Sequence, residues 1–324
     1  MWAVAPYLIP LAITVMANWG LAYRVWKSIT YLALSLLNAI MLCGGLFFLA
    51  FPRLVRMSSV PLSAELQGMN FVGIGTALSA TALLGSLCLV PPWRHLLARW
   101  LPLDPESPVH TVAQCFFVYL AATSLVPLLT DQKAITSILE SASLGTAEMV
   151  SGQVIFVLIA LAGVGLGIRR NPRETVQRLG IAWPQRRHWL SAGVAIVALL
   201  TLDYVVSVGW YKLWPASYAL VSESSAHLFA GFTSPVGALL LALSAGIGEE
   251  TLFRGAIQPR FRIPATAILF AVSHMQYGIS PAMLEIFIVG LVLGWVREKC
   301  NTTTCMVVHA GYNFFSILLS PLLP

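Results

Sequence analysis

The chain has 324 residues, of which 58% are hydrophobic and only 10% are charged, and its mean hydropathy is +0.80. Soluble domains carry roughly 25% charged residues, so a soluble fold of this length would lack the polar surface needed to cover its core. The net charge of +6 does not point to nucleic acid, because basic residues gather in the cytoplasmic loops of membrane proteins. We therefore expect an integral, multi-pass membrane protein that binds lipid bilayer and no nucleic acid.

Ten apolar segments are long enough to cross a bilayer, which requires about 20 mostly apolar residues. In chain order they are 3–23, 30–51, 70–90, 111–130, 149–168, 189–209, 229–249, 263–279, 281–297 and 303–323. Gly, Pro and ionisable residues interrupt the last four and blur their ends. The sequence predicts an all-α, polytopic transmembrane helix bundle of about ten spans.

Basic residues are divided unevenly between the two sides of this arrangement. With the N-terminus outside, the predicted inner loops hold 15 of the 19 Lys and Arg residues. The four outer residues are Arg53, Arg56, Lys133 and Lys212. Since Lys and Arg concentrate in cytoplasmic loops, the asymmetry favours an even number of spans with both ends outside.

The chain divides near residue 215, into a variable transmembrane helical region at 1–215 and a segment at 216–324 that carries the chemistry. The largest predicted inner loop, 169–187, contains six Arg and one Glu. We expect this loop to lie along the anionic cytoplasmic lipid surface, with binding of a partner as the alternative.

Ionisable side chains interrupt the late segments. A charge at the bilayer centre costs roughly 2.5–3.5 kcal/mol on insertion scales, so such residues persist where they are paired, hydrated or functional. Glu250 and Arg254 are four residues apart and can pair on one helical face. Glu249 points about 100° away and lacks this partner, which leaves its carboxylate free for chemistry; a solvated acidic helix end is the alternative. Glu285 and Asp203 either line a cavity or pair internally.

Two later segments each contribute a histidine. His274 lies in the otherwise apolar eighth segment, where a lone histidine is more often a satisfied core residue than a functional one. His309 and Asn313 stand near the start of the last segment, four residues apart, so both project to one side of a helix. Between them, the small residues Ala310 and Gly311 allow close approach of another helix.

Together these residues form a set suited to hydrolysis. Two Glu, one Arg, two His and one Asn fall within residues 249–313 and supply a base, a proton carrier and donors for an oxyanion. In the predicted topology Glu249 and His309 lie in the cytoplasmic half of the membrane, and His274 lies nearer its middle. Bundled helices would bring them around one water-accessible cavity.

The order of these residues resembles the motifs EExxxR, FxxxH and HxxxN of the CAAX-protease and bacteriocin-processing (CPBP, or Abi) family of intramembrane proteases. The matching residues are Glu249, Glu250 and Arg254, then Phe270 and His274, then His309 and Asn313. Residues 290–297 are also similar to the penultimate helix of that family. The resemblance covers residues 230–320 and implies a CPBP-type catalytic helical core; residues 1–215 resemble no family that we can name.

The resemblance implies a role for each matching residue. Glu249 would be the general base that activates water, and His274 would hold and polarise that water. His309 and Asn313 would stabilise the oxyanion. The residues that would support the site are Glu250, Arg254 and Phe270.

The resemblance does not decide whether a metal ion takes part in the reaction. The family is often called a metalloprotease, and zinc catalysis uses three protein ligands and a water, which Glu249, His274 and His309 could supply. The sequence contains no HExxH spacing, however, and Asn313 is better explained as an oxyanion donor. We favour a glutamate-type reaction without a cofactor, with a zinc endopeptidase as the alternative.

The family implies an endopeptidase that cuts a peptide or membrane-associated protein within or beside the membrane. Its members include CAAX prenyl endopeptidases, which remove three residues after a prenylated cysteine, and bacterial proteins linked to bacteriocin maturation or self-immunity. A non-catalytic immunity or scaffold protein and a proton-coupled transporter are the alternatives, since buried Glu and His also mark ion paths. We expect the bacterial plasma membrane, with the active site nearer the cytoplasmic side; the sequence predicts no oligomeric state.

Overall fold

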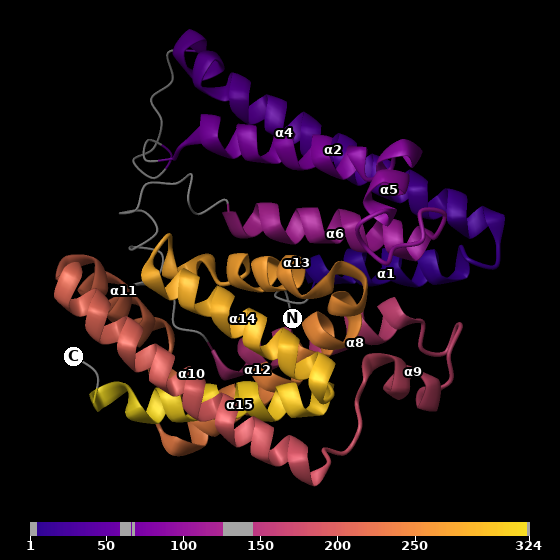
Figure 1. Cartoon of the computed structure of the whole chain (residues 1–324). Helices are drawn as coiled ribbons and strands as arrows, with labels where there is room; N and C mark the ends of the chain where they lie inside the picture. Colours follow the sequence, from indigo (N-terminus) through magenta and orange to yellow (C-terminus); the bar gives the residue numbers. More distant parts are fainter. Residues whose placement is uncertain (1–4, 59–65, 67–68, 126–144, 323–324) are drawn as a thin grey trace.

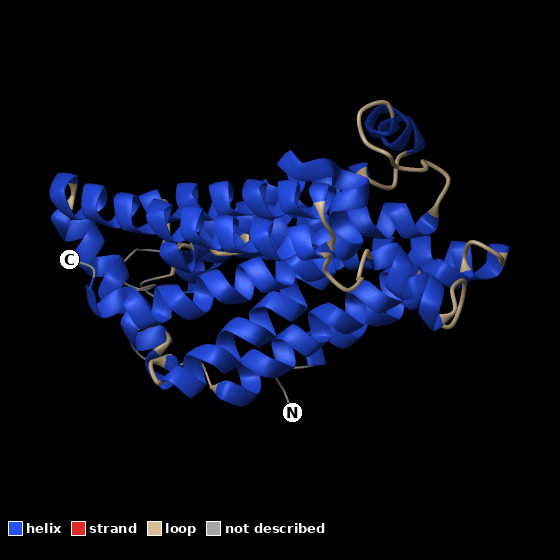
Figure 2. Ribbon diagram, turned by 60° about the horizontal axis from the view of Figure 1, so that its bottom comes forward, coloured by secondary structure: helices blue, strands red, loops and turns tan. Residues whose placement is uncertain are grey.

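The computed structural model describes residues 5–58, 66, 69–125 and 145–322. Within these ranges it consists of helices and contains no β-strand, which confirms the all-α prediction (Figure 2). The helices are α1 (Ala5–Trp19), α2 (Arg24–Ser58), α4 (Phe71–Leu87), α5 (Pro91–Ala98), α6 (Pro108–Leu125), α8 (Thr146–Val164), α9 (Pro172–Leu179), α10 (Arg186–Leu213), α11 (Pro215–Leu228), α12 (Pro235–Glu250), the π-helix η4 (Thr251–Ile257), α13 (Gln258–Val272), α14 (Pro281–Lys299) and α15 (Thr302–Leu319). The long helices lie side by side in a bundle, with α5 and α9 at one end (Figure 1).

The outer surface of the bundle is suited to lipid. Along α10, the exposed residues Leu190, Val194, Val197 and Tyr204 recur at steps of three, four and seven, which places them on one helical face. A continuous exposed apolar stripe is unfavourable in water but matches the hydrocarbon of a bilayer. The chain is therefore an integral membrane protein.

The number of spans stays a prediction. Each of the ten predicted segments corresponds to a helix of the bundle. Among the described residues, six helical segments are long and apolar enough to cross a membrane, and α4 with α5 forms a seventh candidate that is bent by 79°. One of the six, Pro235–Val272, combines α12 and α13, so the count depends on how this bent segment sits in the bilayer.

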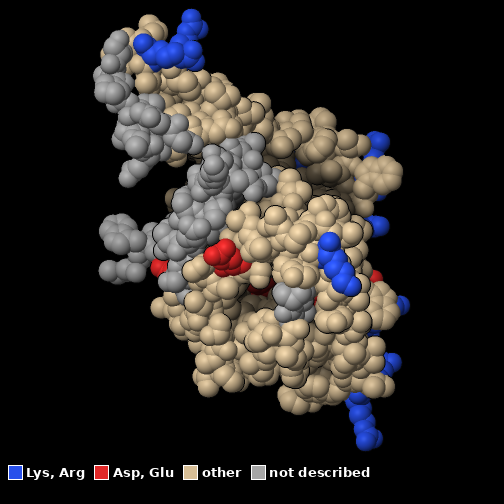
Figure 3. All heavy atoms as spheres, turned by 90° about the vertical axis from the view of Figure 1, so that its left-hand side faces the viewer, with Lys and Arg blue, Asp and Glu red and all other residues tan. Residues whose placement is uncertain are grey.

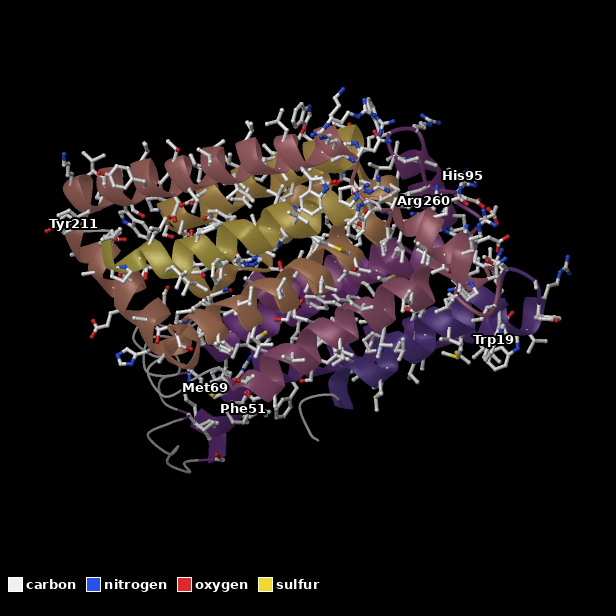
Figure 4. All side chains as sticks on the ribbon, turned by 90° about the horizontal axis from the view of Figure 1, so that it is seen from below. Trp19, Phe51, Met69, His95, Tyr211 and Arg260 are labelled. Carbon is white, nitrogen blue, oxygen red and sulfur yellow. The ribbon has the colours of Figure 1, made fainter. Side chains whose placement is uncertain are left out.

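The segments predicted as inner loops meet at one end of the bundle. Arg260 Nη1 donates to the Pro102 carbonyl at 3.1 Å, and the Thr302 amide donates to the Gly180 carbonyl at 2.9 Å. Figure 4 shows Arg260 at this end and Tyr211 at the opposite one. On the opposite end few Lys and Arg side chains are seen, and Asp and Glu atoms lie near the middle of the face, some in a recess (Figure 3). The two hydrogen bonds between segments predicted as inner loops support the predicted arrangement of loops.

The region between the seventh and eighth predicted spans is not a loop. Residues 251–257 form the π-helix η4, and α13 follows directly, with a kink at Arg262 (φ 61°, ψ 174°). This backbone region is nearly restricted to glycine, so Arg262 is strained. Arg254, counted among the 15 basic residues of the predicted inner loops, lies within this helical segment and is fully buried. Hydropathy did not indicate its burial, because the guanidinium is held by partners from other helices that are described below.

Helices on both sides of the predicted division share one core. The largest cluster of buried side chains joins Ala160 of α8, Leu179 of α9 and Leu199 of α10 to Phe270 of α13 and Val308 of α15. A second cluster joins α1, α2 and α6. Because α8, α9 and α10 pack with the later helices, the boundary near residue 215 stays a prediction, and part of the region before it supports the site.

Candidate active site

The two adjacent glutamates and the arginine lie where α12 passes into η4. Glu249 and Glu250 are the last residues of α12, and Arg254 lies in the π-helix. The Thr251 hydroxyl donates to the Ile247 carbonyl at 2.6 Å and bridges the junction. Stretches of π-helix are rare and frequently occur at functional sites. The motif therefore coincides with a local irregularity of the helix that carries it.

Glu250, Arg254 and His309 form a buried polar cluster. Arg254 Nη1 donates to Glu250 Oε1 at 3.1 Å, and His309 Nδ1 lies 2.8 Å from the same oxygen. Arg254 Nη2 also donates to the Gly290 carbonyl of α14 at 3.3 Å. A buried charge without a partner is strongly destabilising, so these contacts explain how the charged groups are tolerated. The pairing of Glu250 with Arg254 expected from their spacing is confirmed.

Glu249 has different neighbours. Gln153 Nε2 donates to its Oε1 at 3.3 Å. Its Oε2 lies 3.8 Å from His274 Nε2 and has no hydrogen-bond donor among the described residues. The Glu249 side chain is 11% exposed, whereas the Glu250 side chain is fully buried. The Oε2 atom of each carboxylate is buried and has no hydrogen-bond donor among the described residues. The two glutamates differ in their surroundings: Arg254 and His309 hold Glu250, whereas Glu249 keeps a partly exposed side chain and lies beside His274.

His274 lies just beyond α13, contrary to the expectation of a helical residue. The helix ends at Val272, and His274 has φ −108° and ψ 32°. Its ring Nδ1 lies 2.8 Å from the Phe270 carbonyl oxygen. The side chain thus provides a contact for a carbonyl group at the end of the helix, where backbone partners are missing. This contact leaves Nε2 as the ring nitrogen that faces Glu249.

Phe270 lies at the centre of the site. Its ring centroid is 4.4 Å from the Arg254 guanidinium carbon, 4.7 Å from the His274 ring and 5.8 Å from the His309 ring. Phe253 packs against it edge-on at 5.3 Å. A cation above an aromatic face is attracted to it, and the ring is almost fully buried. Phe270 thus packs against the polar residues and limits the movement of both histidines.

Small residues bring α15 close to its neighbours. A Cβ atom at Gly246 of α12 would lie 2.9 Å from a carbonyl oxygen of α15, and one at Gly311 would lie 2.5 Å from Ile196 Cδ1 of α10. The close approach predicted at Gly311 is confirmed. Asn313 lies one turn beyond His309, half-buried, and makes no hydrogen bond to any described residue. The structure therefore does not join Asn313 to the network around His309.

A comparison with family models agrees with this arrangement. Residues 231–315 match the model described as type II CAAX prenyl endopeptidase Rce1-like. The chain contains an Rce1-like domain. The matched range includes every motif residue from Glu249 to Asn313, and the family supports a membrane-embedded peptidase acting on peptide or protein substrates. Comparisons with curated proteins and with solved structures found no match.

Gln153 touches the site from outside the Rce1-like domain, and sequence reasoning missed it. It lies on α8, and a Cβ atom at Gly248 would come within 2.3 Å of its Oε1. The glycine thus lets α8 approach α12 so that the amide reaches Glu249. In the sequence, Gln153 stands out only as an amide side chain within an apolar segment. Its partner Glu249 lies 96 residues away in the chain.

Two further carboxylates accept hydrogen bonds from hydroxyl groups of α15. Tyr312 donates to Glu285 Oε1 at 2.9 Å, and Ser316 donates to Asp203 Oδ2 at 2.7 Å. Both donors lie on α15, beyond His309 in the chain. Internal pairing, one of the two alternatives left open for Glu285 and Asp203, is therefore confirmed.

The zinc alternative built on Glu249, His274 and His309 stays a prediction. Among the described residues, no group of three or more His, Cys, Asp or Glu side chains is placed to bind a metal ion. Within the alternative ligand set, His309 directs Nδ1 to Glu250, and His274 directs Nδ1 to a backbone carbonyl, so the Nε2 atom of each ring is left free. Contacts of this kind also orient histidines that bind metals, and the zinc alternative is therefore tested directly below.

Proposed function

We propose that the protein is an intramembrane endopeptidase in which Glu249 is the general base. The observation that carries this proposal is the environment of its carboxylate. Oε1 is held by Gln153, while Oε2 is unoccupied and lies 3.8 Å from His274 Nε2. One water molecule could bond to both of these atoms, which is the geometry required of a base. Glu250 is already bound by Arg254 and is not accessible.

The reaction follows from this placement. Glu249 takes a proton from the water, whose oxygen attacks the carbonyl carbon of the scissile peptide bond. His274 Nε2 orients the water and keeps its lone pair directed at that carbon. Collapse of the tetrahedral intermediate breaks the C–N bond, and protonated Glu249 gives its proton to the leaving amine. The products are a new carboxylate and a new amine, and the enzyme is regenerated.

His309 and Asn313 are the proposed oxyanion donors. The contact of His309 Nδ1 with Glu250 fixes the orientation of the ring and leaves Nε2 for the substrate. The Asn313 amide makes no hydrogen bond to the described residues, so its N–H groups are available when an oxyanion forms. Donors of this kind typically contribute about 3–4 kcal/mol to stabilising the transition state.

The proposed substrate is a membrane-associated peptide or protein. The family description names CAAX prenyl endopeptidases, which favours a prenylated C-terminal segment; a leader peptide of the bacteriocin type is the alternative. Glu249 lies at the end of α12 nearest the predicted inner loops, so we propose that the substrate reaches the site from the cytoplasmic side of the plasma membrane.

The test compares the wild type with Glu249→Gln and Glu148→Gln in the same membranes. Gln keeps the shape of the side chain but cannot accept the proton, and Glu148 is an exposed glutamate at the start of α8. Mass spectrometry of protein termini, together with cleavage of prenylated CAAX and leader peptides by the purified proteins, gives the readout. We expect cleavage by the wild type and Glu148→Gln only. Equal cleavage by Glu249→Gln would overturn the assignment of the base.

The proposed absence of a cofactor is tested on the same purified protein. Extensive dialysis against a zinc chelator should leave the rate of peptide cleavage unchanged. Loss of the rate on chelation, with recovery on adding Zn²⁺, would instead establish the zinc alternative built on Glu249, His274 and His309.

A further inference from the structure

A cluster of arginines surrounds a cavity at the end of the bundle that holds the predicted inner loops. The cavity measures about 450 Å³ and is lined by Arg169, Arg170, Glu174, Gln177 and Arg178. These residues lie on the turn that follows α8 and on the short helix α9. The cavity is thus separate from the catalytic residues and belongs to the part of the chain before the Rce1-like domain.

The turn that presents the first two arginines is rigidly built. Gly165 has φ 89°, and a Cβ atom there would lie 2.8 Å from both Arg169 Nε and Asn18 Oδ1. Arg169 Nε donates to Asn18 Oδ1 at 2.7 Å, and Arg170 Nη1 donates to the Val164 carbonyl. Only glycine fits this combination of backbone angle and close contact. The guanidinium groups are therefore held in place before any ligand arrives.

The positive charge in this cavity is not neutralised by the protein. Among the described residues no ion pair involves Arg169, Arg170 or Arg178. The one acidic side chain of the lining, Glu174, accepts a hydrogen bond from the Asn171 amide at 2.9 Å as part of a helix cap. Each guanidinium has five donors and uses only one or two of them. Several charged donors thus remain without an acceptor.

Neighbouring arginines raise the local positive charge further. Burial lowers the pKa of Arg178 to about 10, and the charges of Arg260, Arg170 and Arg297 add to this effect. Burial and the same kind of repulsion lower the pKa of Arg169 to about 10 as well. A bound anion would relieve this repulsion, because an opposite charge favours the protonated guanidinium.

We propose that this cavity is a binding site for a single phosphate group, carried either by an anionic phospholipid headgroup or by a free phosphate. Planar guanidinium groups bind phosphate oxygens through paired hydrogen bonds, and three of them converge here. The cavity lies at the end of the bundle where lipid phosphates are found. The proposal does not depend on the proteolytic activity.

The site also has a direct link to the catalytic helices. Arg178 Nη1 donates to the Gly255 carbonyl of η4 at 3.0 Å. A Cβ atom at Gly255 would lie 3.0 Å from Leu179 Cδ2, so α9 packs tightly on the π-helix. An occupied site would hold α9, and with it the π-helix that begins after Glu250, in place.

The experiment measures phosphate binding by wild type, Arg169→Gln/Arg170→Gln and Gln177→Glu. Gln177→Glu adds a negative charge to the cavity without removing an arginine contact, so it remains informative if the double variant is unstable. Arg173→Gln is the matched control, because Arg173 is exposed on α9 and does not line the cavity. Native mass spectrometry of the detergent-purified full chain counts bound phosphatidylglycerol and phosphatidylcholine, and calorimetry measures binding of inorganic phosphate.

We expect wild type and Arg173→Gln to retain phosphatidylglycerol in preference to phosphatidylcholine, and both cavity variants to bind it about tenfold more weakly or worse. The double variant loses charge-assisted donors to the phosphate, and Gln177→Glu adds a charge that repels it. Binding of inorganic phosphate with the same ranking of variants, but no preference for the anionic lipid, also supports the site and identifies a soluble source. If neither probe distinguishes the cavity variants from wild type, the proposal is wrong, and an acidic peptide becomes the candidate occupant.

Discussion

The N-terminal helices α1, α2, α4 and α6 and the catalytic helices α12 to α15 are both apolar bundles, but different interactions hold them together. Glycines join α2 to α4, since a Cβ atom at Gly75 would lie 2.7 Å from the Gly45 carbonyl oxygen. In the catalytic helices, buried charges join α12, η4 and α15 through Glu250, Arg254 and His309. Close backbone packing is sufficient to associate helices in a membrane, whereas a buried ionic cluster is costly.

The segment that carries the glutamates differs from α2 in how much protein surrounds it, whereas α15 is no more buried than α2. In the most apolar stretch of Pro235–Val272, 56% of the residues are buried, against 17% for α2. The helices that carry the glutamates are thus shielded from lipid by their neighbours, while α2 is largely exposed to it. We infer that buried charged groups, which destabilise a helix bundle, are retained where they perform chemistry. The N-terminal bundle then serves as support. Four measurements test this contrast, in order of expected effect.

The largest effect is expected from Glu249→Gln. Removing the proposed base should lower kcat/KM roughly 10²–10⁴-fold, because Gln cannot accept the proton of the attacking water. The unfolding midpoint should change little, since the side chain keeps its shape and its contact with Gln153. Initial rates on a purified peptide substrate provide the measurement. A rate within a few-fold of that of Glu148→Gln would remove Glu249 from the mechanism.

A large loss of stability is expected from Arg254→Met. It removes the guanidinium that pairs with the fully buried Glu250 and leaves His309 as its remaining partner, which should cost up to about 3–5 kcal/mol of unfolding free energy. The double variant Glu250→Leu/Arg254→Met should recover much of this stability, because no buried charge is left, but should remain inactive since His309 loses its partner. Unfolding by titration with SDS reports the first quantity and peptide cleavage the second. A double variant no more stable than the single one would contradict the pairing.

In the N-terminal bundle, Gly45→Ala should reduce stability and leave the chemistry intact. The added Cβ would lie 2.4 Å from Ser79 Oγ and 2.8 Å from the Ser79 amide nitrogen, and overpacking of this kind costs about 1–3 kcal/mol. Gly44→Ala is the matched control, because nothing lies within 4 Å of its Cβ position. The activity of the folded fraction should equal that of wild type for both variants. A selective loss of kcat in Gly45→Ala would show that this bundle does more than support the site.

The smallest effect is expected from Gln153→Ala, which connects α8 to the catalytic helices. Loss of one hydrogen bond of about 0.5–1.5 kcal/mol should lower kcat about two- to tenfold, because Glu249 is no longer oriented. KM should stay constant, as Gln153 is not proposed to touch the substrate. Ser151→Ala is the control, because the Ser151 hydroxyl on the same helix donates only to the Glu148 carbonyl. A change in KM alone would indicate a role in substrate binding instead.

The sequence by itself determined the class of the protein and the position of its chemistry. Hydropathy and charge are sums over local residues, so they identified an all-α membrane protein. The spacing of Glu250 and Arg254 predicted their contact because both lie within one helical turn. The three motifs from Glu249 to Asn313 also led to the family that the comparison with family models supports.

Only the tertiary structure decided which groups meet across helices. It paired His309 with Glu250 and His274 with Glu249, and it brought Gln153 from a helix far away in the chain. It also placed His274 beyond the end of α13, because a contact of its ring with a backbone carbonyl competes with continuation of the helix. Contacts of this kind depend on how closely helices pack at individual small residues such as Gly248. Neither periodicity nor hydropathy contains that information, since both describe one helix at a time.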